Sequence, residues 1–315
     1  MTRDSTRTAV RIGLLTALTF ALMLLAVWPH KRIYLYGEND FLAIYAGAKL
    51  AFTDQLYNPD AVRQVQVDAA GATGEILRFS RLPGYAMLLS PFRLLPYLPA
   101  YAVWQLMNLA AVIGAVALWP YRRSTYASVL SVWLPLYIAF AGGQDVAFIL
   151  LGLAAFFRVL ESKRFGWAGF ALGICLIKFH LIWGVALVLL RHRLFRTVMG
   201  LAAAGALFVL PGFVVNLDWP LEYYSSIVAW RVEVPKTTYT LFPLVGWIGL
   251  PVAAGFVWLA AMRFTLPAAA CAAVALAILV SPNGYIADYT LMAPLVALIV
   301  QSRSGPAAGD RTGFA

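Results

Sequence analysis

Apolar runs of membrane length recur along the whole chain, separated by short polar or basic segments. An isolated apolar segment in lipid must satisfy its own backbone hydrogen bonds, so each run predicts a helix rather than a strand. The pattern therefore predicts an all-α polytopic membrane protein with about ten membrane-embedded helices. The expected helices cover residues 12–28, 100–119, 125–141, 145–160, 165–177, 179–190, 197–215, 241–262, 266–281 and 286–300.

Two neighbouring runs, 165–177 and 179–190, are too short to cross a bilayer comfortably. Both lie between basic loops, at 163–164 and 191–193, and so predict a helical hairpin that enters the membrane from the cytoplasm. Its tip holds Lys178 and His180, two ionisable side chains within an otherwise apolar stretch.

The composition supports a single transmembrane domain. Of the 315 residues, 62% are hydrophobic and 12% are charged, and the mean hydropathy is +0.78. No long soluble stretch interrupts the apolar runs, so we expect one domain over 1–303 and a disordered cytoplasmic tail over 304–315. Cys175 and Cys271 lie inside apolar runs and lack the spacing of a disulfide framework or a zinc site.

Membrane topology explains the net charge of +10 better than nucleic-acid binding does, because the basic residues are scattered and form no stripe with interleaved aromatics. With the N-terminus in the cytoplasm, 14 basic and 3 acidic residues lie on the cytoplasmic side, and 10 basic and 11 acidic residues lie outside or at the hairpin tip. This asymmetry satisfies the positive-inside rule. We therefore expect a multi-pass protein of the plasma (inner) membrane, with no nucleic-acid partner.

The segment of about residues 29–99 is expected to be an amphipathic first extracytoplasmic loop. Asn39 or Asp40 can cap a helix that continues to about Phe52, and Asn58 with Pro59 has the pattern of a second helix start. Prolines at positions 83, 91, 96 and 99 then indicate a shallow or re-entrant helix before the second span.

The candidate general base is Asp40, a few residues beyond the first predicted helix, where partial burial near lipid would raise its pKa. Helix capping explains the same residue about as well. Glu38 is a second carboxylate nearby and the fallback candidate, although a solvated loop position is its simpler interpretation.

Lys178 is the sharpest candidate for binding a phosphate, because ionisable groups at membrane depth are rare and costly. The alternative is that Lys178 snorkels or pairs with Asp145 or Asp288. His180 can hydrogen-bond a sugar or a phosphate, and a structural role is equally common for a lone histidine.

The turn that contains Gln144 and Asp145 opens a helix whose free N–H groups favour a polar ligand, although a simple capped turn explains it nearly as well. Arg81, Arg231 and Asp288 are exterior charges near membrane ends, where interface anchoring is the usual role and substrate contact the less common one. The chain has no Asp-x-Asp pair, P-loop, Gly-x-Ser-x-Gly or His-Glu-x-x-His motif, so we expect no metal and no cofactor.

A set of short motifs follows in order along almost the whole chain: Asp40-Phe41, Tyr45-Ala46, Leu56-Tyr57-Asn58-Pro59, Leu82-Pro83, Leu89-Ser90-Pro91-Phe92, Trp104-Gln105-Leu106-Met107-Asn108, Gly143-Gln144, Ala168-Gly169 through Gly173 to Lys178, Ser281-Pro282 and Asp288-Tyr289. In this order the motifs resemble glycosyltransferase family 87 (DUF2029). That family is a group of GT-C membrane glycosyltransferases that includes polyprenol-phosphate-mannose-dependent mannosyltransferases.

The resemblance implies a GT-C-like fold and inverting transfer of a hexose such as mannose. The donor would be a polyprenyl-phosphate sugar, the acceptor a lipid or glycan in the cell envelope, and the active site extracytoplasmic among membrane lipids. Asp40 would deprotonate the acceptor hydroxyl, and Lys178 would hold the donor phosphate. His180, Arg81 and Arg231 are further candidates for the phosphate, and Glu38, Gln144, Asp145 and Asp288 for other substrate contacts.

Two other functions fit the same pattern less well. A lipid-carrier flippase or small-solute transporter also uses intramembrane charges and broken helices, but it commonly shows repeat symmetry, which this chain lacks. A non-catalytic assembly subunit is the third possibility, because one carboxylate and one lysine are a small catalytic signature.

Overall fold

The computed structural model describes residues 3–71, 77–233 and 239–303, and within those ranges it contains helices and no strands. This confirms the all-α prediction for the described residues. The expected tail over 304–315 lies outside them, as do residues 72–76 of the segment expected to form the first extracytoplasmic loop.

Three helical stretches are long and apolar enough to cross a membrane: α6 (Tyr97–Leu118), α12 (Phe195–Val215) and the stretch Phe242–Arg263, which includes α15 (Gly249–Arg263). A fourth span is possible if α7 (Arg123–Ser131) and α8 (Leu134–Ala141), bent by 63°, count as one. These helices support a membrane protein. The number of about ten spans is not confirmed within the described residues, because several predicted ranges contain shorter helices.

Helix length explains why fewer than ten membrane spans are identified among the described residues. Each of the ten predicted ranges contains helix, but α16 (Leu266–Leu279) has 14 residues and α9 (Val146–Glu161) has 16. At 1.5 Å per residue these helices measure roughly 21 and 24 Å, less than the hydrocarbon core of about 30 Å.

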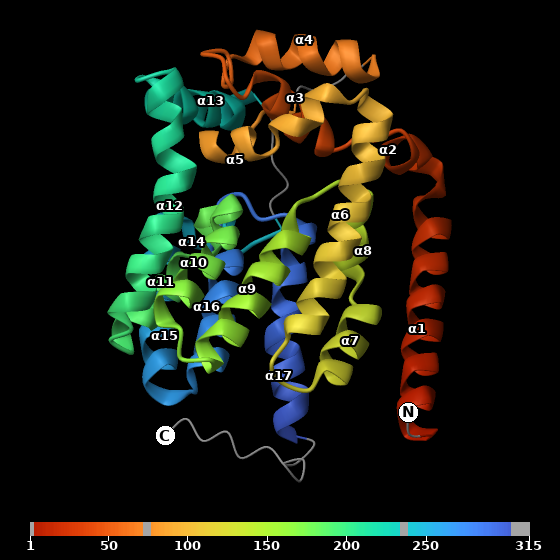
Figure 1. The fold of residues 1–315 in the computed structure, drawn as a ribbon, viewed down its shortest axis with the longest axis vertical. Helices are drawn as coiled ribbons and strands as arrows, with labels where there is room; N and C mark the ends of the chain where they lie inside the picture. The colour runs from red at the N-terminus through yellow and green to blue at the C-terminus, as the bar shows by residue number, and fades with distance from the viewer. Residues whose placement is uncertain (1–2, 72–76, 234–238, 304–315) are drawn as a thin grey trace.

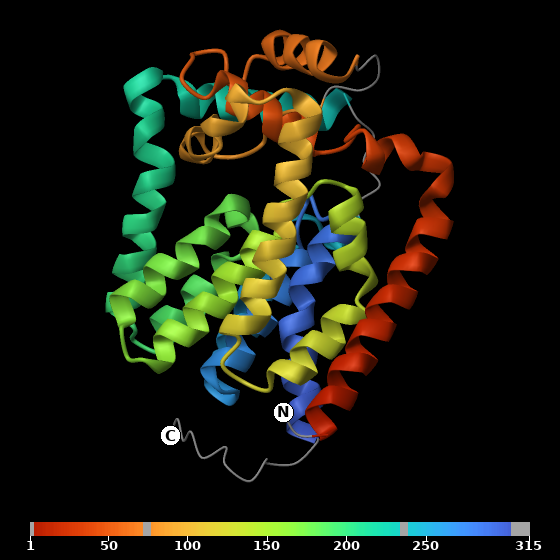
Figure 2. The same ribbon diagram turned by 45° about the vertical axis from the view of Figure 1, so that its right-hand side comes forward.

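The helix α1 (Arg3–Val27) runs along one edge of the molecule in Figures 1 and 2. Leu14 and Leu22 on this helix are exposed. The helix α9 lies at the centre instead, between α6 and α10 (Phe165–Leu172), and its Ile149, Leu150 and Phe156 are fully buried. Small residues let α10 approach α12: a Cβ on Gly169 would strike the backbone of Thr197.

The predicted hairpin is broken at its expected tip. After α10 the chain continues as a 3₁₀ segment, Gly173–Leu181, in which Lys178 leaves helical geometry with φ −125° and ψ 65°. The chain then returns as α11 (Trp183–Arg191). This break sets the Lys178 side chain into the interior of the protein, where it is only 4% exposed.

The segment expected to form the first extracytoplasmic loop contains several helices. Together with α13 (Trp219–Glu233), its helices gather at the end of the molecule opposite the start of α1 and the end of α17 (Ala293–Arg303) (Figure 1). They are α2 (Lys31–Leu35), α3 (Phe41–Leu50), α4 (Pro59–Ala70) and α5 (Pro83–Leu88). The Asn58 side chain caps α4 by accepting from the backbone N–H groups of Asp60 and Ala61, with Pro59 in the first turn.

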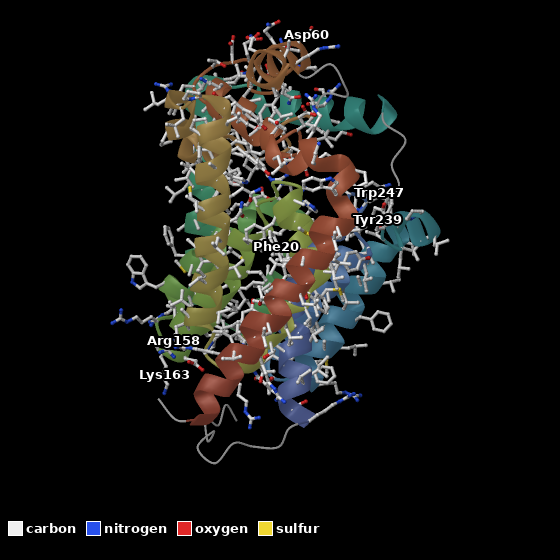
Figure 3. All side chains as sticks on the ribbon, turned by 90° about the vertical axis from the view of Figure 1, so that its right-hand side faces the viewer. Phe20, Asp60, Arg158, Lys163, Tyr239 and Trp247 are labelled. Atoms are coloured by element: carbon white, nitrogen blue, oxygen red, sulfur yellow. The ribbon has the colours of Figure 1, made fainter. Side chains whose placement is uncertain are left out.

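Charged residues lie at both ends of the long axis. Figure 3 shows Arg158 and Lys163 at one end and Asp60 at the other. The turns between α6 and α7 and between α9 and α10 both lie at the Lys163 end (Figure 1), and they carry Arg122, Arg123, Lys163 and Arg164. This end is the one that the positive-inside rule would assign to the cytoplasm.

Candidate active site

Asp40 occupies the N-cap position of α3, but its side chain makes no capping hydrogen bond. The neighbouring Asn39 does, because its Oδ1 accepts from the Phe41 backbone N–H at 3.0 Å. Capping therefore does not occupy the Asp40 carboxylate, which lies at a half-buried position. Of the two roles that the sequence left open for Asp40, side-chain capping is absent from the structure.

Asn39 fixes this part of the chain from three sides. Its Nδ2 donates to the Ile33 carbonyl at 2.6 Å, to the Tyr101 hydroxyl at 3.1 Å and to the Ala141 carbonyl at 2.9 Å. Sequence reasoning treated Asn39 only as a possible cap and missed this positioning role. No sequence signal distinguishes it, because the partners come from distant segments.

The turn between α8 and α9 lies directly against Asp40. The Asp40 backbone N–H donates to the Gly142 carbonyl at 3.2 Å, and the Trp104 indole N–H donates to the Gly143 carbonyl at 2.9 Å. Gly143 has φ +62°, and a Cβ there would collide with the Asn39 side chain. The glycine thus allows this turn to pack closely against Asn39 and Asp40.

Beyond this turn lies a buried cluster of charges. The Lys178 ammonium donates to Asp288 Oδ1 at 2.6 Å and to Gln144 Oε1 at 2.8 Å, and lies 3.8 Å from Asp145 Oδ1. The Arg81 guanidinium binds Asp145 with two parallel hydrogen bonds, from Nε to Oδ2 at 2.8 Å and from Nη2 to Oδ1 at 3.1 Å. Lys178 thus contacts Gln144, Asp145 and Asp288 directly, and Arg81 is linked to it through Asp145. All four were predicted site residues.

The two ion pairs that were the alternative to phosphate binding by Lys178 are both present. They do not use all of its hydrogen-bonding capacity. A lysine ammonium has three donors, and among the described residues Lys178 Nζ makes two hydrogen bonds. The third N–H makes no hydrogen bond among the described residues.

Burial raises the pKa of Asp40 from 3.8 to about 6, against the opposing fields of Lys178 and Arg81, while Asp145 and Asp288 add to the rise. Asp40 lies between α2 and α3, outside the helices long enough to span a membrane. A carboxylate with a pKa near 6 is still ionised at neutral pH and is a stronger base than an ordinary aspartate.

The other three predicted residues are placed as follows. His180 is half-buried and packs edge-on against the Phe179 ring, with centroids 5.9 Å apart. Glu38 does not contact the charge cluster but pairs with the exposed Arg32, whose Nε lies 2.8 Å from Glu38 Oε1. Arg231 lies in α13, and its side chain is outside the described part of the structure.

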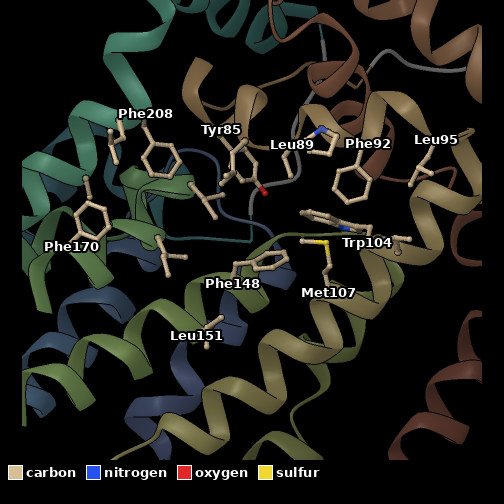
Figure 4. A pocket seen from close by; sticks show the side chains of 18 residues that line it. Tyr85, Leu89, Phe92, Leu95, Trp104, Met107, Phe148, Leu151, Phe170 and Phe208 are labelled. Atoms are coloured by element: carbon tan, nitrogen blue, oxygen red, sulfur yellow. The ribbon is translucent and has the colours of Figure 1, made fainter. Parts of the chain in front are cut away.

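An apolar cavity of about 670 Å³ lies beside the charge cluster. Its wall includes Ile177, the residue before Lys178, and Phe148 from the first turn of α9. Figure 4 shows the aromatic side chains that line it, from Phe170 and Phe208 on one side to Trp104 and Phe92 on the other. The cavity had no counterpart in the sequence analysis.

The model of glycosyltransferase family 87 matches residues 83–302, more than two thirds of the chain. The chain belongs to glycosyltransferase family 87. This confirms the resemblance and indicates a membrane glycosyltransferase. The range matched to family 87 includes Gln144, Asp145, Lys178 and Asp288, and it begins after Asp40 and Arg81. No curated protein and no solved structure matched the chain.

Proposed function

We propose that this family 87 protein transfers a sugar, such as mannose, from a polyprenyl-phosphate donor to a lipid or glycan acceptor at the extracytoplasmic face. The observation that carries the proposal is that the apolar cavity is lined by Ile177, which precedes the buried Lys178, and by Tyr85, four residues after the half-buried Arg81. A polyprenyl-phosphate sugar has the matching shape, because an isoprenoid chain ends in a phosphate that carries the sugar. Family membership supports the reaction class.

In the proposed reaction Asp40 acts as the general base. It takes the proton of an acceptor hydroxyl while that oxygen bonds to the anomeric carbon of the donor sugar. The bond between the anomeric carbon and the phosphate oxygen breaks with its electron pair on the phosphate. Attack on the face opposite the leaving group inverts the anomeric centre.

Lys178 and Arg81 are the proposed phosphate ligands. The phosphate gains a negative charge as the glycosidic bond breaks, and cations already in place stabilise that charge more in the transition state than in the bound donor. They supply the neutralisation that other transferases obtain from a metal ion, so we propose a metal-independent reaction. His180, two residues after Lys178, is the further candidate for this contact.

Donor binding must overcome an unfavourable charge balance. With Asp40, Asp145 and Asp288 ionised, three carboxylates face the two cations Arg81 and Lys178. We propose that the donor phosphate uses the third N–H of Lys178 and replaces part of the Asp145 contact with Arg81. The carboxylates then hold the cations in position until the donor arrives, rather than leaving them unpaired.

A polar cleft is the proposed acceptor side. It has a volume of about 610 Å³ and lies between the start of α4 and α13, at the end of the molecule that also holds α3. Amide and carboxylate side chains dominate its wall, among them Gln55, Asn58, Asp60, Asn216 and Glu222. Such groups suit the hydroxyls of a glycan head group.

The proposed orientation follows the basic end of the molecule. With the Lys163 end in the cytoplasm of a plasma (inner) membrane, the N-terminus is cytoplasmic and Asp40 is extracytoplasmic. Residues 1–303 then form one transmembrane domain, in contact with membrane lipids over its exposed apolar helices.

The test is sugar transfer by the purified protein in lipid, using a panel of polyprenyl-phosphate sugars with a membrane glycolipid extract. Nucleotide sugars serve as the control donors, and EDTA is added to a parallel series. We expect transfer from at least one polyprenyl-phosphate sugar, unchanged by EDTA, and none from nucleotide sugars. Transfer from a nucleotide sugar alone would refute the proposed donor class.

A further inference from the structure

Tyr85 presents a buried hydroxyl to the apolar cavity. The residue is 2% exposed and lines the cavity wall, and its hydroxyl has no hydrogen-bond partner among the described residues. Figure 4 shows the oxygen directed into the cavity, toward the side of Trp104 and Phe148. A buried hydroxyl without a partner is unfavourable, and such groups commonly bind a ligand or water.

The surrounding structure holds the Tyr85 ring in this orientation. Its ring packs against Phe208 of α12, with centroids 6.5 Å apart. The preceding Gly84 lies so close to α12 that a Cβ would strike the backbone of Leu207 and Phe208. The six-residue helix α5 therefore packs closely against α12, which places the Tyr85 backbone beside the cavity wall.

The hydroxyl lies at the boundary between the apolar cavity and the charge cluster. Tyr85 follows Arg81 by four residues, and the charges of Asp145 and Arg81 both act on it. Burial, with a contribution from Asp145, raises the pKa of Tyr85 well above its ordinary value. The group therefore stays protonated and available as a hydrogen-bond donor.

We propose that the Tyr85 hydroxyl donates a hydrogen bond to a phosphate oxygen of the polyprenyl-phosphate donor. This inference rests on the proposed function and adds a binding residue to it. Where an isoprenoid chain leaves an apolar cavity, its first polar group is the phosphate. A neutral donor suits that position better than a third cation, because it adds no charge that must be desolvated when the cavity is empty.

The test compares two lipids and three proteins by ligand-dependent thermal unfolding in lipid nanodiscs. The lipids are a polyprenyl phosphate and the polyprenol of the same length, which lacks the phosphate. The proteins are the wild type, Tyr85→Phe and Tyr126→Phe. Tyr126 is the matched control, since it is also buried with an unpartnered hydroxyl but does not line the cavity.

We expect the wild type to bind polyprenyl phosphate more tightly than polyprenol. In Tyr85→Phe that preference should fall roughly 10- to 100-fold, as expected for the loss of a hydrogen bond to a charged group. Polyprenol binding should stay unchanged, and Tyr126→Phe should match the wild type for both lipids.

Three results would overturn the inference. In the first, Tyr85→Phe prefers polyprenyl phosphate as strongly as the wild type does. In the second, Tyr85→Phe loses affinity for both lipids equally, as a packing role requires. In the third, the wild type binds neither lipid. Sugar transfer is measured separately. If the expected binding pattern occurs without transfer, the proposed reaction is refuted and the phosphate contact of Tyr85 stands. If transfer occurs but Tyr85→Phe keeps the wild-type preference for polyprenyl phosphate, the reaction stands and the Tyr85 contact is refuted.

Discussion

The pH dependence of transfer is the prediction that most directly uses the environment of Asp40. A general base works when it is deprotonated, so activity should be lost as the pH falls through its pKa. With the pKa raised to about 6 by burial, about nine-tenths of the carboxylate is ionised at pH 7 and about one-tenth at pH 5. We therefore expect kcat/KM to fall about tenfold between these two values.

An unperturbed aspartate would give a different profile. With a pKa of about 3.9, more than nine-tenths of the carboxylate stays ionised at pH 5, and kcat/KM would change by less than about one-tenth. The assay is initial-rate transfer at subsaturating donor across this pH range, with thermal unfolding in the same lipid as a control for loss of structure. A profile that is flat down to pH 5 would refute the argument.

Neighbouring charges should shift the midpoint in opposite directions. Lys178→Gln removes a cation that lowers the Asp40 pKa and should move the midpoint upward, whereas Asp288→Asn removes an anion that raises it and should move the midpoint downward. Glu38→Gln is the control and should leave the midpoint unchanged, because Glu38 pairs with Arg32. The midpoint is the measured quantity, since the first two variants also change the rate.

Two further predictions concern the cavity and the turn. Leu207→Trp places a larger ring in the cavity wall, which should displace the isoprenoid chain and raise the KM for the donor at least about tenfold. Leu210→Trp is the control, because Leu210 is also 60% exposed on α12 but does not line the cavity, and it should leave that KM unchanged. Gly143→Ala should lower the free energy of unfolding by more than about 1 kcal/mol, because φ is +62° and the Cβ meets Asn39. Gly255→Ala on α15, where a Cβ meets nothing within 4 Å, is the control and should leave the free energy of unfolding unchanged or slightly higher. Chemical or thermal unfolding in lipid measures both variants.

Local patterns in the sequence predicted much of the fold. Each apolar run became helix, Asn58 capped α4 as expected, and the helix broke at Lys178. The number of membrane spans was not predictable from the same pattern, because apolar character does not report helix length or the 63° bend between α7 and α8. Hydropathy cannot separate a spanning helix from a short one buried among its neighbours.

The sequence named the members of the charge cluster one by one but did not predict their arrangement. Partners in the charge cluster are far apart in sequence: Arg81 and Asp145 by 64 residues, and Lys178 and Asp288 by 110. The sequence named Asn39 and Asp40 as equally good caps, because both residue types accept a hydrogen bond from a helix start. Only the tertiary contacts of Asn39 leave the Asp40 carboxylate for another role.

The central claim is that Asp40 is the general base of a sugar transfer from a polyprenyl-phosphate donor. Its most direct test is transfer by Asp40→Asn in lipid, compared with the wild type and with Glu38→Gln at equal amounts of folded protein. We predict that Asp40→Asn is slower by roughly two to four orders of magnitude, the range for loss of a general base, and that Glu38→Gln remains close to the wild type. Full transfer by Asp40→Asn, or a large loss in Glu38→Gln alone, would contradict the claim.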